Sequence, residues 1–352
     1  MDLRALKAPI VQAPLAGGAS TPQLTAAVAS AGGFGFLAAG YKTAEAVAGD
    51  IRELRALSDA PFGVNVFAPP ATNVDPAAVA AYAASLATDA RHYGTHTGEP
   101  RHDDDHFADK LELMVAERPA VVSFTFGCPE ALVVTRLHEA GCDVWVTITS
   151  PDESELAAAA GADALVVQGL EAGGHRGGFS DPPQYEEFGL LSLLRLVAQC
   201  VPVRLVASGG IGDGAAVAAV LAAGADAAQV GTALMLSPEA GTPLAYREAL
   251  KQERATSLTR AFSGRRARGI VNRFMVEHDA GAPVAYPDVH YVTTPIRAAA
   301  REAGDAEAIN LWAGQTHTLA VEKPAAEIVR RLTEDARASV AEAAERLGDS
   351  RS

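Results

Sequence analysis

The residues best suited to chemistry lie in a glycine-rich stretch near the middle of the chain, "QGLEAGGHRGG" at Gln168–Gly178. This stretch follows the apolar run 164–167, which has the composition of a buried strand, and it holds an amide, a carboxylate, an imidazole and a guanidinium. A neutral imidazole at His175 is able to take a proton from a weakly acidic carbon or to hydrogen-bond an anionic substrate. A lone histidine is more often structural, so the surrounding elements decide its role.

Short runs rich in Val, Ile, Leu and Phe alternate along the chain with Ala-rich segments of helical period. This alternation is typical of parallel strands joined by crossover helices. We predict eight strands, at Pro9–Leu15, Phe34–Ala39, Phe62–Phe67, Ala120–Phe126, Asp143–Thr149, Ala164–Gln168, Val203–Ala207 and Ala227–Val230. The predicted helices include Thr21–Ala31, Thr43–Leu57, Pro129–Ala140, Asp152–Ala160 and Asp213–Ala223. Eight such units predict an α/β fold, the (β/α)8 TIM barrel.

A doubly wound open sheet is the competing fold. Its usual strand count and its glycine-rich loop after the first strand are both missing. The segment "GFGFLA" from Gly33 matches a dinucleotide fingerprint in letters, but it leads into a strand and not out of one into a helix. We therefore favour the barrel.

Two segments exceed what a barrel needs. Residues 70–119 hold two helical patterns where one crossover helix would suffice, and residues 237–310 follow the last strand. We predict a barrel at 1–236 with a helical insertion at about 70–119, a helical cap or substrate subdomain at 237–310 over the C-terminal mouth, and a segment at 311–352 that returns to the barrel. We expect the basic run Arg260–Gly269 to lie in solvent because it is short.

Two glycine loops follow the seventh and eighth predicted strands, where TIM barrels commonly bind phosphate. The first, "SGGIGDG" at Ser208–Gly214, offers the backbone of Gly209 and Gly210 beside a helix that opens at Asp213. The second, "QVGTALM" at Gln229–Met235, adds the amide of Gly231 and the hydroxyl of Thr232. Each loop alone is explained equally well by a tight turn. The pair, at the expected strand ends, predicts a phosphate site.

Flavin mononucleotide (FMN) needs polar groups along its ring edge in addition to a phosphate site. The first strand ends in "QAPLAGG", whose Ala13, Pro14 and Leu15 allow a flat ring to lie on the backbone. Asn65 and Gln168 end the third and sixth strands, and each amide both donates and accepts hydrogen bonds. An isolated amide at a strand end would be explained by backbone capping, but their convergence on one rim favours a flavin.

Seven segments follow one another in a characteristic order: "PIVQAPLAGG", "GVNVFAP", "SFTFG", "QGLEAGGHRGG", "ASGGIGDG", "QVGTALM" and "YPDVHYVTTPIR". In this order and spacing, from Pro9 to about Leu319, the chain resembles the class I nitronate monooxygenases, the FMN enzymes formerly called 2-nitropropane dioxygenases. The resemblance implies that an alkyl nitronate of the propionate 3-nitronate type is oxidised by O2 to a carbonyl compound and nitrite without NAD(P)H. Whether neutral nitroalkanes are also oxidised stays open.

The resemblance also implies roles for particular residues. His175 is the expected catalytic residue, and Tyr286, His290 and Tyr291 are expected near the substrate, although aromatic anchors of a packed loop would explain these three equally well. The implied flavin contacts are Ala13, Pro14, Leu15, Asn65, Gln168, Gly173, Gly174, Gly209, Gly210, Gln229, Gly231 and Thr232. The roles of Arg176 and Cys128 stay open. We expect only one of Ser123 and Thr125, on the fourth strand, to face the barrel lumen.

Three alternative functions share some of these sequence features. An FMN-dependent enoyl-acyl carrier protein reductase shares the barrel and the A-G-G-H element but would need NAD(P)H, and no residue excludes it. A purine-nucleotide dehydrogenase is disfavoured because residues 169–188 hold no nucleophilic cysteine. A non-catalytic protein that binds a flavin or phosphate ligand would leave His175 unexplained.

Composition limits the partners and the compartment. The net charge of −14 argues against nucleic acid, and the lack of a long apolar run or signal peptide argues against a membrane and for the cytoplasm. We expect Cys128, Cys142 and Cys200 to be reduced, packed thiols with no zinc. The segment "RHDDDHF" is expected to be a solvated helix start and not a metal site. The expected partners are a small anionic nitronate and O2, and a homodimer stays open.

Overall fold

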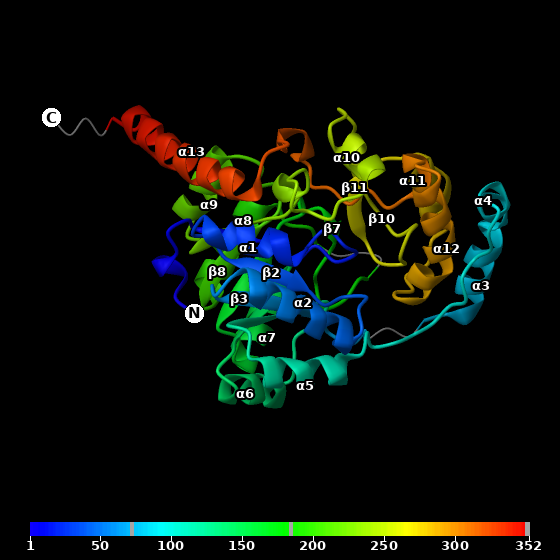
Figure 1. The fold of residues 1–352 in the computed structure, drawn as a ribbon, viewed down its shortest axis with the longest axis horizontal. Coiled ribbons are helices and arrows are strands. Elements are labelled where there is room, and N and C mark those ends of the chain that lie inside the picture. The colour runs from blue at the N-terminus through cyan, green and yellow to red at the C-terminus, as the bar shows by residue number, and fades with distance from the viewer. Residues whose placement is uncertain (71–73, 183–185, 349–352) are drawn as a thin grey trace.

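The computed structural model describes residues 1–70, 74–182 and 186–348 and contains a barrel of eight parallel strands (Figure 1). The barrel strands are β1 (Ile10–Gln12), β2 (Gly35–Ala38), β3 (Phe62–Phe67), β4 (Val121–Thr125), β5 (Asp143–Ile148), β6 (Ala164–Gln168), β8 (Arg204–Ser208) and β9 (Ala227–Val230). They pair in the order β1-β9-β8-β6-β5-β4-β3-β2, and a parallel bridge between Val11 and Phe34 joins the two ends. The predicted TIM barrel is therefore confirmed.

Strand register brings the polar strand ends together at one rim. Gln168 of β6 pairs with Ser208 of β8, which in turn pairs with Gln229 of β9. On the other side of the barrel, Asn65 of β3 pairs with Ser123 of β4. Because parallel strands all end at the same face, these side chains surround one mouth.

Apolar side chains fill the interior of the barrel below this mouth. They also fill the layer between the strands and the helices that surround them. Inside, Phe34, Phe36 and Trp145 are at most 1% exposed, and their ring centroids lie 5.3–5.8 Å apart. The outer wall is covered by α1 (Pro22–Ser30), α2 (Ala44–Leu57), α5 (Phe107–Glu117), α6 (Ala131–Glu139), α7 (Pro151–Ala160), α8 (Leu190–Cys200), α9 (Gly214–Ala222) and α13 (Ala325–Arg346). None of the described helices combines the length and apolar composition that a membrane-spanning helix needs.

A second buried core lies beside the mouth (Figure 1). It joins α3 (Pro76–Ser85) and α4 (Ala87–His92), from between β3 and β4, to α10 (Leu244–Leu250), α11 (Arg273–His278) and α12 (Asp288–Glu302). The Tyr82 hydroxyl of α3 donates to the carbonyl of Ala261, 2.6 Å away. Two sequence segments far apart in the chain therefore build one layer over the barrel.

The layer over the mouth also includes a small antiparallel sheet, which the sequence did not lead us to expect. It consists of β10 (Thr256–Thr259), β11 (Ala267–Ile270) and the two-residue strand β7 (Gly174–His175), with His175 opposite Ala267. The strands are two to four residues long, and none of them contains a run of apolar residues like those that predicted the barrel strands. As a result His175 belongs to a sheet and not to a free loop.

The basic run Arg260–Gly269 is not in solvent, contrary to our expectation. Arg265 and Arg268 are only 6% and 5% exposed. Arg260 and Arg266 form ion pairs with the buried carboxylate of Asp181, at 3.0 and 2.7 Å. The partner carboxylate lies about eighty residues earlier in the chain, so the length of the basic run alone could not reveal its burial.

The cysteine prediction holds for one residue and fails for another. Cys142 is buried and Cys128 is half-buried, but Cys200, the last residue of α8, is exposed. Burial raises the pKa of Cys128 to about 11, so this thiol stays protonated at neutral pH.

Candidate active site

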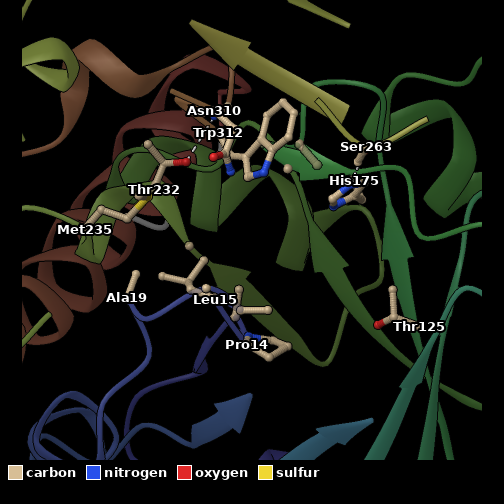
Figure 2. Close-up of a pocket in the computed structure, with 18 of the residues that line it drawn as sticks. Pro14, Leu15, Ala19, Thr125, His175, Thr232, Met235, Ser263, Asn310 and Trp312 are labelled. Atoms are coloured by element: carbon tan, nitrogen blue, oxygen red, sulfur yellow. Dashed lines mark hydrogen bonds between the residues drawn. The ribbon is translucent and has the colours of Figure 1, made fainter. Parts of the chain in front are cut away.

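A cavity of about 380 Å³ opens at the C-terminal mouth of the barrel, between the strand ends and the second core. His175 and all of the predicted flavin contacts line it: Ala13, Pro14, Leu15, Asn65, Gln168, Gly173, Gly174, Gly209, Gly210, Gln229, Gly231 and Thr232. Figure 2 shows Pro14 and Leu15 on one side and Trp312 and Asn310 on the other. The fold thus gathers these residues around one space, and their individual roles stay predictions.

The turn after β1 presents backbone to the cavity because a buried side chain holds it from behind. Gln12 is fully buried, and its Nε2 donates to Ser20 Oγ and to the carbonyl of Phe36, both 2.9 Å away. Ser20 Oγ also accepts from the Leu15 amide at 2.8 Å. The turn at Pro14 is therefore held by protein contacts, as a surface for a flat ring requires.

The prediction that Ser123 and Thr125 face opposite sides was wrong. The amide nitrogen of Asn65 donates to Ser123 Oγ at 2.9 Å and to Thr125 Oγ1 at 3.0 Å. Residues two apart on a strand share a face, so both hydroxyls point into the barrel. Together they fix the orientation of the Asn65 amide at the rim.

Gln168 and Arg176 hold the loop that carries His175. Gln168 Nε2 donates to the His175 carbonyl at 3.0 Å, and its Oε1 accepts from the Gly177 amide at 2.9 Å. Arg176, 3% exposed, donates from Nη1 to Gln168 Oε1 at 3.1 Å and to the Gly169 carbonyl at 2.6 Å. The open question about Arg176 is thus answered in structural terms: it is a positioning residue that joins the two ends of the loop.

The two glycine loops form a close-fitting backbone cradle. Gly209 and Gly210 have φ of 116° and 68°, which side chains rarely adopt, and a Cβ on Gly209 would lie 3.0 Å from Ala172. On the facing loop, Thr232 Oγ1 accepts from the Gly314 amide at 3.1 Å. A Cβ on Gly173 would come within 2.4 Å of that same amide nitrogen. Only glycine permits this approach, so the cradle depends on the A-G-G-H element.

A hydrogen-bond relay orients His175 and selects its tautomer. His175 Nε2 lies 2.8 Å from Ser263 Oγ, and the Ser263 hydroxyl donates to the Arg265 carbonyl at 3.2 Å. We assign the single hydroxyl proton to that carbonyl, and with this assignment Ser263 Oγ accepts from His175 Nε2–H. His175 Nδ1 therefore carries the lone pair and is the atom able to accept a proton.

The surroundings of His175 keep its ring neutral. Its centroid lies 5.4–5.7 Å from the rings of Phe126, Tyr286 and Trp312. Burial, followed by the nearby charges of Arg265 and Arg297, lowers the pKa of His175 to about 3. At neutral pH the imidazole is therefore an uncharged base.

Of the three predicted substrate contacts, only His290 lines the cavity. His290 stacks on Tyr41 with ring centroids 4.3 Å apart. Tyr286 lies one layer behind, where its hydroxyl donates to Tyr41 Oη at 3.2 Å. The structure does not bring Tyr291 to the cavity, because its hydroxyl turns away to Asp103, 2.7 Å distant. For Tyr291 the packing alternative fits the observed contacts.

Several lining residues were missed by the sequence analysis. They come from α12 and from the segment after it: Thr294, Arg297, Ala298, Arg301, Ile309, Asn310, Trp312, Gly314 and Thr316. Arg297 and Arg301 carry the only full charges in the described lining, which contains no aspartate or glutamate. The recognisable motif in this region, "YPDVHYVTTPIR", ends at Arg297 and could have drawn attention to it.

The segment "RHDDDHF" leads into α5, which begins at Phe107, and Asp104 is exposed as expected, but two of its side chains have partners in the fold. Asp105 pairs at 2.6 Å with the fully buried Lys110, and His102 Nδ1 lies 2.9 Å from Asp288. Elsewhere Asp89, Glu277 and His278 have the spacing of a metal site. There Arg273 already forms an ion pair with Asp89 at 2.7 Å, and His278 lies 2.8 Å from the same carboxylate.

Comparison with known proteins connects this site to a family. The sequence profile of nitronate monooxygenase matches residues 2–335. The chain is 42% identical over 348 residues to the nitronate monooxygenase of Pseudomonas aeruginosa, covering 95% of this chain and 98% of that protein.

Solved structures agree with the sequence comparison. Nitroalkane oxidase from Streptomyces ansochromogenes is 48% identical with a TM-score of 0.94, over 97% of this chain and 99% of that one. FabK from Thermotoga maritima is more distant, at 26% identity and a TM-score of 0.75 over 97% and 96% of the two chains. The chain belongs to the nitronate monooxygenase family.

Proposed function

We propose that this protein uses FMN to oxidise alkyl nitronates with O2, giving a carbonyl compound and nitrite. Family membership supports the oxidation of nitronates or nitroalkanes by a flavin enzyme. The observation that carries the proposal for this chain is a neutral His175, its Nδ1 lone pair free, beside a cavity that fits a flavin. Propionate 3-nitronate represents the proposed substrate class.

The residues present fit FMN in shape and in charge. The left-handed glycines after β8 and the Gly231–Thr232 turn after β9 offer backbone amides and a hydroxyl for one phosphate. The absence of carboxylates from the described lining avoids repulsion of that phosphate. The fixed backbone at Pro14 would support the ring, and Asn65 would contact its polar edge. When bound, the flavin would take an electron from the nitronate and pass reducing equivalents to O2.

His175 would act on the substrate and not on the flavin. With a neutral nitroalkane, Nδ1 would take the proton from the carbon that bears the nitro group, while Ser263 holds Nε2–H. With a preformed nitronate no proton has to be removed, so the imidazole would only orient the anion. The wall of Phe126 and Trp312 would keep water from the reacting carbon.

The first experiment identifies the flavin and the reaction. The purified protein should be yellow, should release FMN and not FAD on denaturation, and should form nitrite from propionate 3-nitronate under air. The enoyl reductase alternative predicts instead that NADH bleaches the flavin anaerobically at a catalytic rate. Such bleaching, or a lack of nitrite release, would rule out the proposed function.

A variant tests the role of His175. His175→Asn should retain FMN and lose turnover of a neutral nitroalkane by about 100-fold or more, as expected when a general base is removed. Oxidation of the matching preformed nitronate should fall much less. Equal losses on the two substrates would remove the assignment of His175 as the base. If His175→Asn binds FMN as tightly as the wild-type protein does, and the wild-type protein oxidises neither substrate, the non-catalytic alternative would stand.

A further inference from the structure

Tyr41, which follows β2 and lines the cavity, has a hydroxyl proton that no described residue accepts. Its hydroxyl oxygen accepts a hydrogen bond from the Tyr286 hydroxyl at 3.2 Å, so the proton of Tyr41 itself is directed elsewhere. Burial raises the pKa of Tyr41 to about 12, and the proton is therefore retained at neutral pH. A donor that is shielded from bulk water is costly when it has no acceptor. The missing acceptor points to a ligand in the cavity.

The backbone of Tyr41 is held in a conformation that a bulky residue rarely adopts. Its φ is 64°, in the left-handed region. The Tyr41 amide donates to Asp105 Oδ1 at 2.9 Å, and Asp105 Oδ2 forms an ion pair at 2.6 Å with the fully buried Lys110. Residues in such conformations persist only where the surrounding structure enforces them, and they cluster at functional sites. The buried ion pair therefore fixes the position of Tyr41 at the rim of the barrel.

Tyr41 belongs to the same group of rings as His175. Tyr286 connects the two residues, because its hydroxyl contacts Tyr41 and its ring centroid lies 5.7 Å from that of His175. Phe67 and Phe126 connect them on a second path, with centroids 5.3 Å from Tyr41 to Phe67, 4.7 Å from Phe67 to Phe126 and 5.6 Å from Phe126 to His175. Both Tyr41 and His175 line the cavity. One small molecule is therefore within reach of both side chains.

Removal of a proton from a nitroalkane places negative charge on the nitro oxygens. The C–H bond breaks, the proton moves to His175 Nδ1, and the electron pair of that bond delocalises onto the nitro group. A hydrogen-bond donor aimed at those oxygens stabilises the charge as it develops. Ser263 does not supply this donor, because its hydroxyl proton is assigned to the Arg265 carbonyl. The hydroxyl proton of Tyr41 has no such assignment among the described residues.

We propose that Tyr41 is a further catalytic residue, whose hydroxyl donates a hydrogen bond to a nitro oxygen of the substrate. His175 would remove the proton from carbon, and Tyr41 would stabilise the nitronate without giving up its own proton. Asp105 and Lys110 would act on the reaction only by positioning Tyr41. The inference rests on the proposed function for the reaction, but the contact between Tyr41 and a planar anion can be measured without turnover.

Tyr41→Phe keeps the ring that stacks on His290 and removes only the hydroxyl. With 1-nitropropane, kcat in an oxygen-uptake assay should fall by about 10- to 100-fold, the size expected for one hydrogen bond to a developing charge. With preformed propyl-1-nitronate, KM should rise by about 3- to 10-fold while kcat stays the same or increases, because oxidation removes the charge that the hydroxyl stabilises. A residue with a merely structural role would instead lower kcat on both substrates.

Butyrate tests the contact without turnover, because its carboxylate has the planar shape and the charge of the nitronate group in propyl-1-nitronate. Butyrate should bind to the FMN-loaded wild-type protein in isothermal titration, and Tyr41→Phe should weaken this binding by about 5- to 20-fold. Tyr93→Phe is the matched control, since the Tyr93 hydroxyl donates to Asp305 at 2.6 Å outside the cavity lining. The control should change neither butyrate binding nor the kinetics on either substrate.

The outcomes separate the inference from the proposed function. Unchanged butyrate binding in Tyr41→Phe, equal losses of kcat on the two substrates, or loss of FMN from the variant would overturn the role of Tyr41. If the wild-type protein oxidises the nitronate but not 1-nitropropane, KM for the nitronate and the affinity for butyrate decide. If butyrate binds through Tyr41 but the wild-type protein oxidises neither substrate, the proposed function fails and the contact with a planar anion stands.

Discussion

Replacing Ser263 by alanine should impair His175 without touching the flavin contacts. The Ser263 side chain is 2% exposed and accepts the Nε2–H of His175 at 2.8 Å. Without it, the ring either buries an unsatisfied N–H or moves its proton to Nδ1, the atom that has to accept a proton from the substrate. A buried, unsatisfied donor costs about 1–3 kcal/mol. We therefore expect kcat/KM for a neutral nitroalkane to fall about 5- to 150-fold.

The assay for this variant is oxygen uptake with a neutral nitroalkane and with its preformed nitronate. The nitronate needs no proton removal, so its kcat/KM should fall by less than about 3-fold. Ser237→Ala is a matched control, since Ser237 is fully buried and donates to the Leu234 carbonyl at 2.8 Å outside the cavity lining. Equal losses on both substrates, or a similar kinetic loss in the control, would refute the tautomer argument.

Two further predictions concern pH and stability. Burial and two nearby arginines lower the pKa of His175 to about 3, so kcat/KM for a preformed nitronate should be nearly flat from about pH 5 to 8. An inflection near pH 6.5 would contradict this. The same pKa shift affects stability, because His175 of the unfolded chain is protonated near its ordinary pKa while the buried ring stays neutral. His175 therefore destabilises the fold as the pH falls from 6.5 toward 3. Asp181→Asn leaves Arg260 and Arg266 without their buried carboxylate and should lower the free energy of unfolding by about 3–5 kcal/mol in urea titrations. Glu187→Gln, which changes a more exposed partner of Arg266, should lower the free energy of unfolding by less than about 1 kcal/mol. A similar loss of stability in both variants would argue against a buried network around Asp181.

The barrel was predictable because its strands are continuous apolar runs that only a buried parallel sheet explains. The predicted Phe62–Phe67 matches β3, and the predicted Pro9–Leu15 extends beyond β1, which ends at Gln12. The excess arises at Pro14, which has no N–H for a strand ladder. The glycines around His175 were equally informative, because their positive φ and close contacts need that residue type.

The partners of the site residues could not be predicted in the same way. Ser263 lies 88 residues after His175, and Asp181 lies 85 residues before Arg266. Such pairs are set by how the second core packs on the barrel, and no local period records them. The length of the basic run alone therefore predicted solvent exposure, which was wrong for Arg265 and Arg268.

The charges near the cavity and the neutral imidazole belong to one electrostatic arrangement. Burial and the charges of Arg265 and Arg297 all disfavour a protonated His175. A nitronate formed beside Nδ1 would stabilise the imidazolium directly. At an effective dielectric constant of about 20, opposite charges about 4 Å apart attract by about 4 kcal/mol. His175 should therefore become a stronger base when an anionic substrate fills the cavity, and the pH profile of kcat should show a higher pKa than that of kcat/KM.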